Sequence, residues 1–315
     1  MNWKISVVIL LVGFLGCKEE SLRKDKEGKA EAETSSTSYF IEADELLKLA
    51  NNSQIKIVDF RKPEIYSETH IKGALNIWRP DIEDSSYPYG GMMANSEKIE
   101  KLFGDLGIAN TNTIVIYDDN GLCDASRLWW ILQNYDFTEV RLLNGGFDAW
   151  KTINGEVSAE IPKIQKTTFK LVENPSMRYY ISKESLVTAL NGEALILDTR
   201  TEDEYSGKRQ KKGAAKGGRI PKSVLLDWSN AINYEGDKKM KSVADLKNIY
   251  GRLFPSKEDT IIVYCHSGVR SAHTSFVLTQ LLGYKNVKNY DGSWTEWSHF
   301  EDLAIVQDST TTIIN

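Results

Sequence analysis

The sequence predicts an α/β protein built from two tandem domains, each a mainly parallel sheet flanked by helices. Three observations lead to this fold class: an internal repeat, short apolar runs that alternate with amphipathic stretches, and a polar segment between the two copies. The chain has 315 residues, of which 41% are hydrophobic and 26% charged. That length and composition suit a globular protein with two ordinary cores.

The internal repeat consists of four blocks that recur in the same order. Tyr117 and Tyr264 are 147 positions apart, and so are Trp150 and Trp297. The first block is offset by only 139 (Asp59 to Asp198), so the second copy carries an insertion of about ten residues, mainly in residues 206–218. The matched blocks are Lys56–Arg61 with Leu195–Arg200, His70–Trp78 with Arg219–Asp227, Ile114–Tyr117 with Ile261–Tyr264, and Leu143–Trp150 with Tyr290–Trp297.

Each copy alternates predicted strands and helices. Apolar runs such as Ile57-Val58 and Ile261-Ile262-Val263 are typical of buried parallel strands. Ser182 is a suitable N-cap for the predicted helix in residues 182–190. This alternation favours a layered α/β fold with right-handed crossovers. The amphipathic stretches between the strands include Ala43–Ala50, Ser126–Asn134 and Ser182–Leu190.

The repeat and the composition together define the expected domains. The N-terminal domain covers residues 39–155 and the C-terminal domain residues 179–306. Between them, residues 156–178 contain Pro162 and Pro175 and form the expected linker. Residues 307–315 are a tail.

The N-terminal residues have the features of an export signal. Residues 1–16 combine Lys4 with an apolar run too short to span a bilayer, as in a signal peptide. Leu15-Gly16-Cys17 resembles a bacterial lipobox, which implies lipidation of Cys17. Residues 17–38 are polar and would form a flexible tether. We therefore expect an exported, lipid-anchored protein on the periplasmic side of the cell envelope, with a soluble periplasmic protein as the alternative.

Bulk charge and cysteine content exclude several function classes. A formal net charge of -5 gives no general attraction for nucleic acid. Three cysteines cannot build a disulfide framework, and no Cys/His cluster has the spacing of a zinc site. We expect neither a metal nor a cofactor.

Cys265 ends the apolar run 261–264, and a short loop with Gly268 leads into a predicted helix. This arrangement places a thiol beside amides at the start of a helix, which favours the nucleophilic thiolate. In the first copy Asp118 takes the place of Cys265. A carboxylate cannot accept sulfur, so only the second copy is expected to react. Cys123 lies among acidic residues and is expected to be unreactive.

These residues resemble the tandem-domain rhodaneses, which are thiosulfate and 3-mercaptopyruvate sulfurtransferases. The similarity spans 39–306. It rests on the Asp-x-Arg after the first strand run of each copy, the cysteine loop, and Asp291-Gly292-Ser293-Trp294 with Trp297. The resemblance implies two rhodanese-like domains, of which the first is inactive and the second catalytic. It also implies a monomer that takes sulfur from a small anionic donor and gives it to a thiol or cyanide.

By the same resemblance, Cys265 carries the sulfur as a persulfide and Arg200 binds the donor. Arg61 occupies the place of Arg200 in the inactive copy, so a structural role for Arg200 is the alternative. The loop resembles the mercaptopyruvate class in part and leaves both donors open. The loop residues expected to bind substrate are His266, Ser267, Gly268, Val269, Arg270 and Ser271. Lys and Arg side chains in the 206–218 insertion would steer anions, or form a solvated loop.

Three other functions are compatible with a reactive Cys265. A persulfide carrier or binding module would deliver sulfur to a partner, and a redox-sensing thiol would be oxidised without a donor. A cysteine-dependent phosphatase is less favoured. Those enzymes place an arginine six residues after the cysteine, where this chain has Ser271, and Arg270 comes one residue earlier.

The lipobox leads to a testable prediction. The mature protein should partition into the detergent phase of a Triton X-114 extraction, and Cys17→Ala should move it to the aqueous phase. Immunoblotting of the two phases measures the effect. A wild-type protein found only in the aqueous phase would leave the soluble periplasmic alternative.

Overall fold

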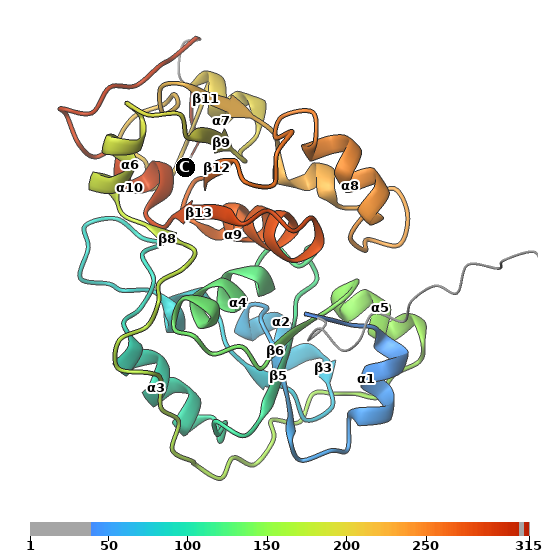
Figure 1. The fold of residues 1–315 in the computed structure, drawn as a ribbon. Coiled ribbons are helices and arrows are strands. Elements are labelled where there is room, and N and C mark those ends of the chain that lie inside the picture. The colour runs from blue at the N-terminus through green and yellow to red at the C-terminus, as the bar shows by residue number, and fades with distance from the viewer. Residues whose placement is uncertain (1–38, 309–311, 315) are drawn as a thin grey trace, which may run out of the picture. The chain divides into compact units, whose positions relative to one another are not determined.

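Two five-stranded parallel sheets, one in each copy, form the frame of the molecule. The computed structural model describes residues 39–308 and 312–314 (Figure 1). The strand order is β4-β2-β5-β6-β1 in the first repeat (residues 39–155) and β11-β9-β12-β13-β8 in the second (residues 179–306). All pairings within these two sheets are parallel. The predicted fold class and internal repeat are confirmed.

The first repeat begins at β1 and ends after α5. Its elements are β1 Phe40–Ile41, α1 Ala43–Leu49, β2 Ile55–Asp59, α2 Pro63–Glu68, β3 His70–Ile71, β4 Leu75–Asn76, η1 Arg79–Ile82, α3 Ser96–Asp105, β5 Thr113–Tyr117, α4 Ala125–Asn134, β6 Val140–Leu143 and α5 Gly146–Thr152.

The second repeat follows a similar order, but β10 lies in its insertion, η3 is additional, and the residues matched to β3 form only an isolated bridge at Arg219. Its elements are β8 Tyr180–Ile181, α6 Lys183–Ala189, β9 Leu195–Asp198, α7 Glu202–Ser206, β10 Arg209–Lys211, β11 Ser223–Leu225, η2 Trp228–Ala231, α8 Val243–Tyr250, β12 Thr260–Tyr264, α9 Val269–Phe276, the π-helical η3 Val277–Leu281, β13 Asn286–Tyr290 and α10 Ser293–Trp297. In the tail, β14 (Thr312–Ile314) pairs with β10.

The predicted helices form within one or two residues of their expected bounds. At α6, Ser182 accepts a hydrogen bond from the amide of Ser185 and is the N-cap, as expected. Helix α4 differs from the amphipathic pattern, because every one of its residues is buried. It packs against α9 of the second repeat, where the rings of Trp129 and Phe276 meet edge to face at 4.9 Å. The second repeat therefore covers the side of α4 that carries Trp129.

The segment between the repeats packs along the first repeat. Strand β7 (Val157–Ser158) pairs antiparallel with β3. Phe169 is buried in the main core of the first repeat, where its ring lies 4.9 Å from that of Phe103. Val157, Ser158 and Phe169 of the predicted linker thus pack on the first repeat and do not form a free spacer.

Each repeat sends a loop over the other. The first bridging loop (residues 83–93) contacts the second repeat, where the Met93 amide donates to Asp291 Oδ2 at 2.9 Å. The second bridging loop (residues 232–240) contacts the first repeat, where the Met240 amide donates to Asn144 Oδ1 at 3.4 Å. Both pairs are related by the same offset of 147 positions. The two repeats are therefore joined by two equivalent contacts.

Cys17 and the predicted signal peptide lie outside the described residues. Among residues 39–308 and 312–314, no helix has the length and apolar character needed to cross a membrane.

Candidate active site

Cys265 lies at the carboxyl end of β12, the central strand of the second sheet (Figure 1). Its side chain is 1% exposed. The loop 265–268 turns directly into α9, and Gly268 takes φ +75° at the N-cap. Glycine adopts this left-handed conformation at little cost. The backbone thus turns its amides toward the end of the strand, where the thiol lies.

The surroundings of Cys265 favour the thiolate. Burial, the largest single effect, raises the pKa of the thiol, whereas the charge of Arg270 and a hydrogen bond from the Ser271 hydroxyl lower it. The amides of Ser271 and Ser267 act in the same direction, and the net pKa lies below the ordinary value for cysteine. Ser271 Oγ is buried and has no other hydrogen-bond partner in the described part of the chain. These groups are suited to an anionic sulfur.

The matched loop of the first repeat shows what such a loop can hold. Asp118 Oδ1 accepts hydrogen bonds from the amides of Asn120 and Leu122, both at 2.9 Å. Its Oδ2 accepts from Asp124 at 2.9 Å and from Ala125 at 3.0 Å. Two acceptor oxygens attached to the strand end therefore fill the loop, and burial together with the charge of Asp124 raises the pKa of Asp118 to about 7. The counterparts of Asn120 and Asp124 are Ser267 and Ser271, whose amides lie at Cys265.

The start of α10 fixes the back of the catalytic loop. Ser293 Oγ accepts hydrogen bonds from the amides of Cys265 at 3.1 Å and Gly268 at 3.0 Å. The amides of Trp294 and Thr295 donate to the carbonyls of Cys265 and His266. Ser293 adopts φ +51°, a left-handed backbone conformation that is unfavourable for residues other than glycine. Sequence reasoning missed this role, although Gly146 at the matched position was a signal.

Arg270 is held beside the thiol by Glu204. Its Nη1 donates to Glu204 Oε2 at 2.7 Å and its Nη2 to Oε1 at 2.8 Å. The capping box of α7 orients Glu204, which bonds back to Thr201. A bidentate pair of this kind fixes the guanidinium plane. Arg270 thus supplies a fixed positive charge at Cys265.

The insertion reaches the catalytic loop. His266 Nε2 lies 3.0 Å from the carbonyl oxygen of Lys212, which requires the proton to be on Nε2. Burial, followed by the charge of Lys211, lowers the pKa of His266 to about 4, so the imidazole is neutral near pH 7. Lys211 ends β10, and burial, followed by the charge of Arg270, lowers its pKa. The insertion therefore brings a cation to the neighbourhood of Cys265.

Two other predicted loop residues contact the scaffold. Val269 packs its side chain with Cys123, Trp228 and Ile232. At Gly91, which has φ +99°, an added Cβ would lie 2.6 Å from the Cβ of Ser267. The first bridging loop thus approaches Ser267 so closely that only glycine fits.

Arg200 does not lie free for a donor. Its guanidinium is 1% exposed and pairs with Asp198, with Nη2 2.6 Å from Oδ2. Nη2 also donates to the carbonyl of Gly218 at 2.8 Å. Arg61 repeats this arrangement, with Asp59 at 2.6 Å and the carbonyl of Thr69 at 2.7 Å. This geometry favours the structural alternative, since the same pair occurs where no thiol is present, and the substrate contact of Arg200 stays a prediction.

Cys123 is buried and differs from Cys265 in its charges. Burial, followed by the charge of Asp124, raises the pKa of its thiol well above the ordinary value. An acidic neighbour stabilises the protonated form, so Cys123 has little thiolate near pH 7.

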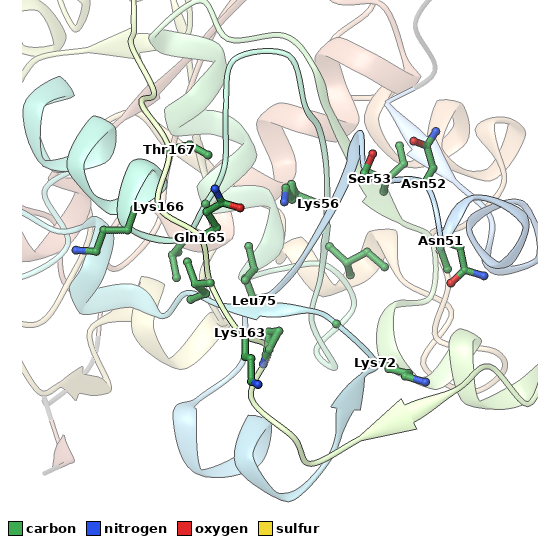
Figure 2. A pocket seen from close by; sticks show the side chains of 18 residues that line it. Asn51, Asn52, Ser53, Lys56, Lys72, Leu75, Lys163, Gln165, Lys166 and Thr167 are labelled. Carbon is green, nitrogen blue, oxygen red and sulfur yellow. The ribbon is translucent and has the colours of Figure 1, made fainter.

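A polar cavity of about 560 Å³ lies elsewhere in the first repeat (Figure 2). It opens at the amino end of β2, beside Lys56, and is also lined by the chain around Lys163. Ligand sites of parallel sheets lie at the carboxyl ends of strands. Two of the lysines shown are already paired, Lys72 with Glu156 and Lys166 with Asp105. This cavity is separate from the Cys265 loop, which contributes none of its lining residues.

Comparisons with known proteins agree with this geometry. The family model for the rhodanese-like domain matches residues 42–153 and again 182–300. The putative thiosulfate sulfurtransferase SseA of Mycobacterium bovis is 35% identical over 249 residues, which are 77% of this chain and 81% of that protein. The sulfur carrier protein TtuD of Thermus thermophilus is 33% identical over 253 residues, with 77% and 87% covered.

A solved structure also matches. The crystal structure of SseA from Escherichia coli, described with the 3-mercaptopyruvate sulfotransferases, superimposes with a TM-score of 0.71 at 24% identity. The match covers 82% of this chain and 99% of that chain. At this sequence identity, the structural similarity supports a shared fold and no more than that.

The matched arginines provide a test of Arg200. Arg200→Lys and Arg61→Lys should each lower the free energy of unfolding by about 1–3 kcal/mol, because each loses a buried fork with its aspartate. Urea unfolding measures both variants, and sulfur-transfer kinetics should give an unchanged KM for the donor. A KM raised more than tenfold in Arg200→Lys alone would instead show a substrate contact.

The charge of Arg270 predicts the pH dependence of Cys265. A thiol with a lowered pKa becomes thiolate at lower pH, so alkylation by iodoacetamide should reach half its maximal rate below the pH found for free cysteine. Mass spectrometry of the Cys265 peptide measures the rate. The double variant Arg270→Gln/Glu204→Gln removes both charges of the pair, so no unpaired carboxylate stays buried. It should move the midpoint of alkylation to higher pH. An unmoved midpoint in this variant would contradict the role of Arg270. In the wild-type protein, the plot of alkylation rate against pH should show no inflection from His266 between pH 5 and 8.

Proposed function

Because this chain belongs to the rhodanese-like domain family and is a sulfurtransferase, we propose that it moves a sulfane sulfur from thiosulfate or 3-mercaptopyruvate to a thiol or cyanide acceptor through a persulfide on Cys265. The observation that carries this proposal is the pair of equivalent loops. One holds the Asp118 carboxylate with four amides. The other presents the thiol of Cys265 to the corresponding backbone, with a lowered pKa.

The reaction proceeds in two displacements. The thiolate of Cys265 attacks the outer sulfur of the donor and forms an S–S bond. The bond between that sulfur and the rest of the donor breaks, and sulfite or the enolate of pyruvate leaves with the electron pair. A thiolate or cyanide then attacks the outer sulfur of the persulfide, the S–S bond breaks, and the Cys265 thiolate is restored. No electrons are lost or gained overall, and no cofactor is required.

The residues of the loop have separate roles in this proposal. The amides of Ser267, Val269 and Ser271 would face the anionic sulfur, as their counterparts hold the carboxylate of Asp118. The amide of Gly268 donates instead to Ser293 Oγ and fixes the loop from behind. Arg270 stabilises the thiolate before attack and the persulfide after it. Lys211 and Lys212, on the insertion, increase the local concentration of anionic donors. His266 stays neutral and orients the loop through Lys212.

A sulfur carrier is the second candidate, supported by the similarity to TtuD of Thermus thermophilus. The same persulfide would then be passed to a partner thiol in place of a small acceptor. Fold and loop are common to the two functions. Rapid transfer to a protein thiol with slow turnover on cyanide would favour the carrier.

We also propose that Cys17 anchors the protein by a lipid to the periplasmic side of the cell envelope. Support comes from the lipobox-like Leu15-Gly16-Cys17 and the polar tether that follows. The anchor would leave the two repeats free in the aqueous phase of that compartment.

Mass spectrometry tests the proposed persulfide. Incubation with thiosulfate or 3-mercaptopyruvate should add one sulfur, about 32 Da, to the peptide that contains Cys265, because the persulfide is the covalent intermediate. Cys265→Ser should abolish both the adduct and turnover, whereas Cys123→Ala should retain both. The ratio of kcat/KM for the two donors identifies the preferred one. Full activity of Cys265→Ser, or turnover of p-nitrophenyl phosphate that depends on Cys265, would contradict the proposal.

A further inference from the structure

Arg127 of the first repeat reaches across to the catalytic loop of the second. It lies on α4 and is 2% exposed. Its Nη2 donates to Asp291 Oδ1 at 2.6 Å and to the carbonyl of Gly91 at 2.7 Å. Its Nη1 donates a long hydrogen bond, 3.5 Å, to the carbonyl of Gly268. One buried guanidinium therefore joins the first bridging loop, the start of α10 and the catalytic loop.

Gly268 packs directly on this guanidinium. A Cβ added at Gly268 would lie 2.8 Å from Arg127 Nη1 and 2.6 Å from the carbonyl oxygen of Asp291. Asn289 Nδ2 donates to the same Gly268 carbonyl at 3.1 Å. The carbonyl is thus held from two sides, one in each repeat.

Holding that carbonyl also fixes the next amide. The peptide unit is planar and trans, so the carbonyl of Gly268 and the N–H of Val269 point in opposite directions. Val269 is the counterpart of Leu122, whose amide donates to Asp118. Arg127 therefore constrains an amide that corresponds to one of the four that hold the carboxylate in the inactive loop.

The inactive side of the interface has no such cation at the matched place. Asn144 stands where Asp291 stands, and it accepts the Met240 amide as Asp291 accepts that of Met93. Thr274 occupies the position that corresponds to Arg127. The bridging loops are thus equivalent, but the buried ion pair occurs only where the loop carries a thiol. Interface stability alone does not require this difference.

We propose that Arg127 is a positioning residue for sulfur transfer: from the first repeat, it orients the Gly268–Val269 peptide so that the Val269 amide faces the sulfur of Cys265. The proposal rests on Cys265 as the reacting thiol. Through Arg127 the first repeat would take part in the reaction, although its own loop carries Asp118 in place of a thiol.

Arg127→Lys tests this role because lysine keeps the charge next to Asp291 but loses the planar fork. We expect kcat for sulfur transfer to fall by about tenfold, less than for loss of a direct oxyanion donor, with KM for the donor nearly unchanged. The midpoint of Cys265 alkylation should move to higher pH in the same variant. Arg127→Met/Asp291→Asn, which leaves no unpaired charge, should show a larger shift in both measurements.

Asn144→Ala is the matched control, because it removes the equivalent contact on the inactive side of the interface. It should leave kcat and the alkylation midpoint unchanged, whatever its effect on thermal unfolding. The proposal is overturned if Arg127→Lys matches wild type in both readouts, or if Asn144→Ala changes them equally. Alkylation needs no sulfur donor, so failure of the sulfurtransferase proposal would be seen separately, in the persulfide measurement.

Discussion

Buried amides at the turn from strand to helix must find an acceptor, and the chemistry of each repeat follows from how it meets this need. In the first repeat the need is permanently met by the Asp118 carboxylate, whose two oxygens accept four amides. In the second repeat the matched position is Cys265, a smaller group that can extend by one sulfur. A loop built to hold an anion thereby favours the thiolate and suits a persulfide.

The requirement for a fixed loop explains much of the surrounding structure. Ser293 holds the amides of Cys265 and Gly268 from behind, at the cost of a left-handed backbone. Glu204 holds Arg270 in plane, and the insertion holds His266 through Lys212. Each contact removes freedom from the loop before substrate arrives, which reduces the reorganisation needed in the reaction.

The first repeat supports the loop that carries Cys265. Gly91 allows the first bridging loop to approach Ser267, and Arg127 reaches the carbonyl of Gly268. Pseudo-symmetry makes such support available on both sides, because each bridging loop covers the opposite strand-to-helix turn. Within this shared scaffold the two sides differ at matched positions such as Asp291 and Asn144.

The sequence by itself determined the α/β class, the repeat, the contrast between Cys265 and Asp118, and the family, because these depend on local pattern and on residue identity at matched positions. Only the tertiary structure showed that the guanidinium of Arg200 is occupied by Asp198 and the carbonyl of Gly218. It also decided that α4 is buried on all sides and that Arg127 reaches the catalytic loop. These facts depend on which surfaces the two repeats bury against each other, and contacts between residues far apart in the chain leave no periodic signal in it.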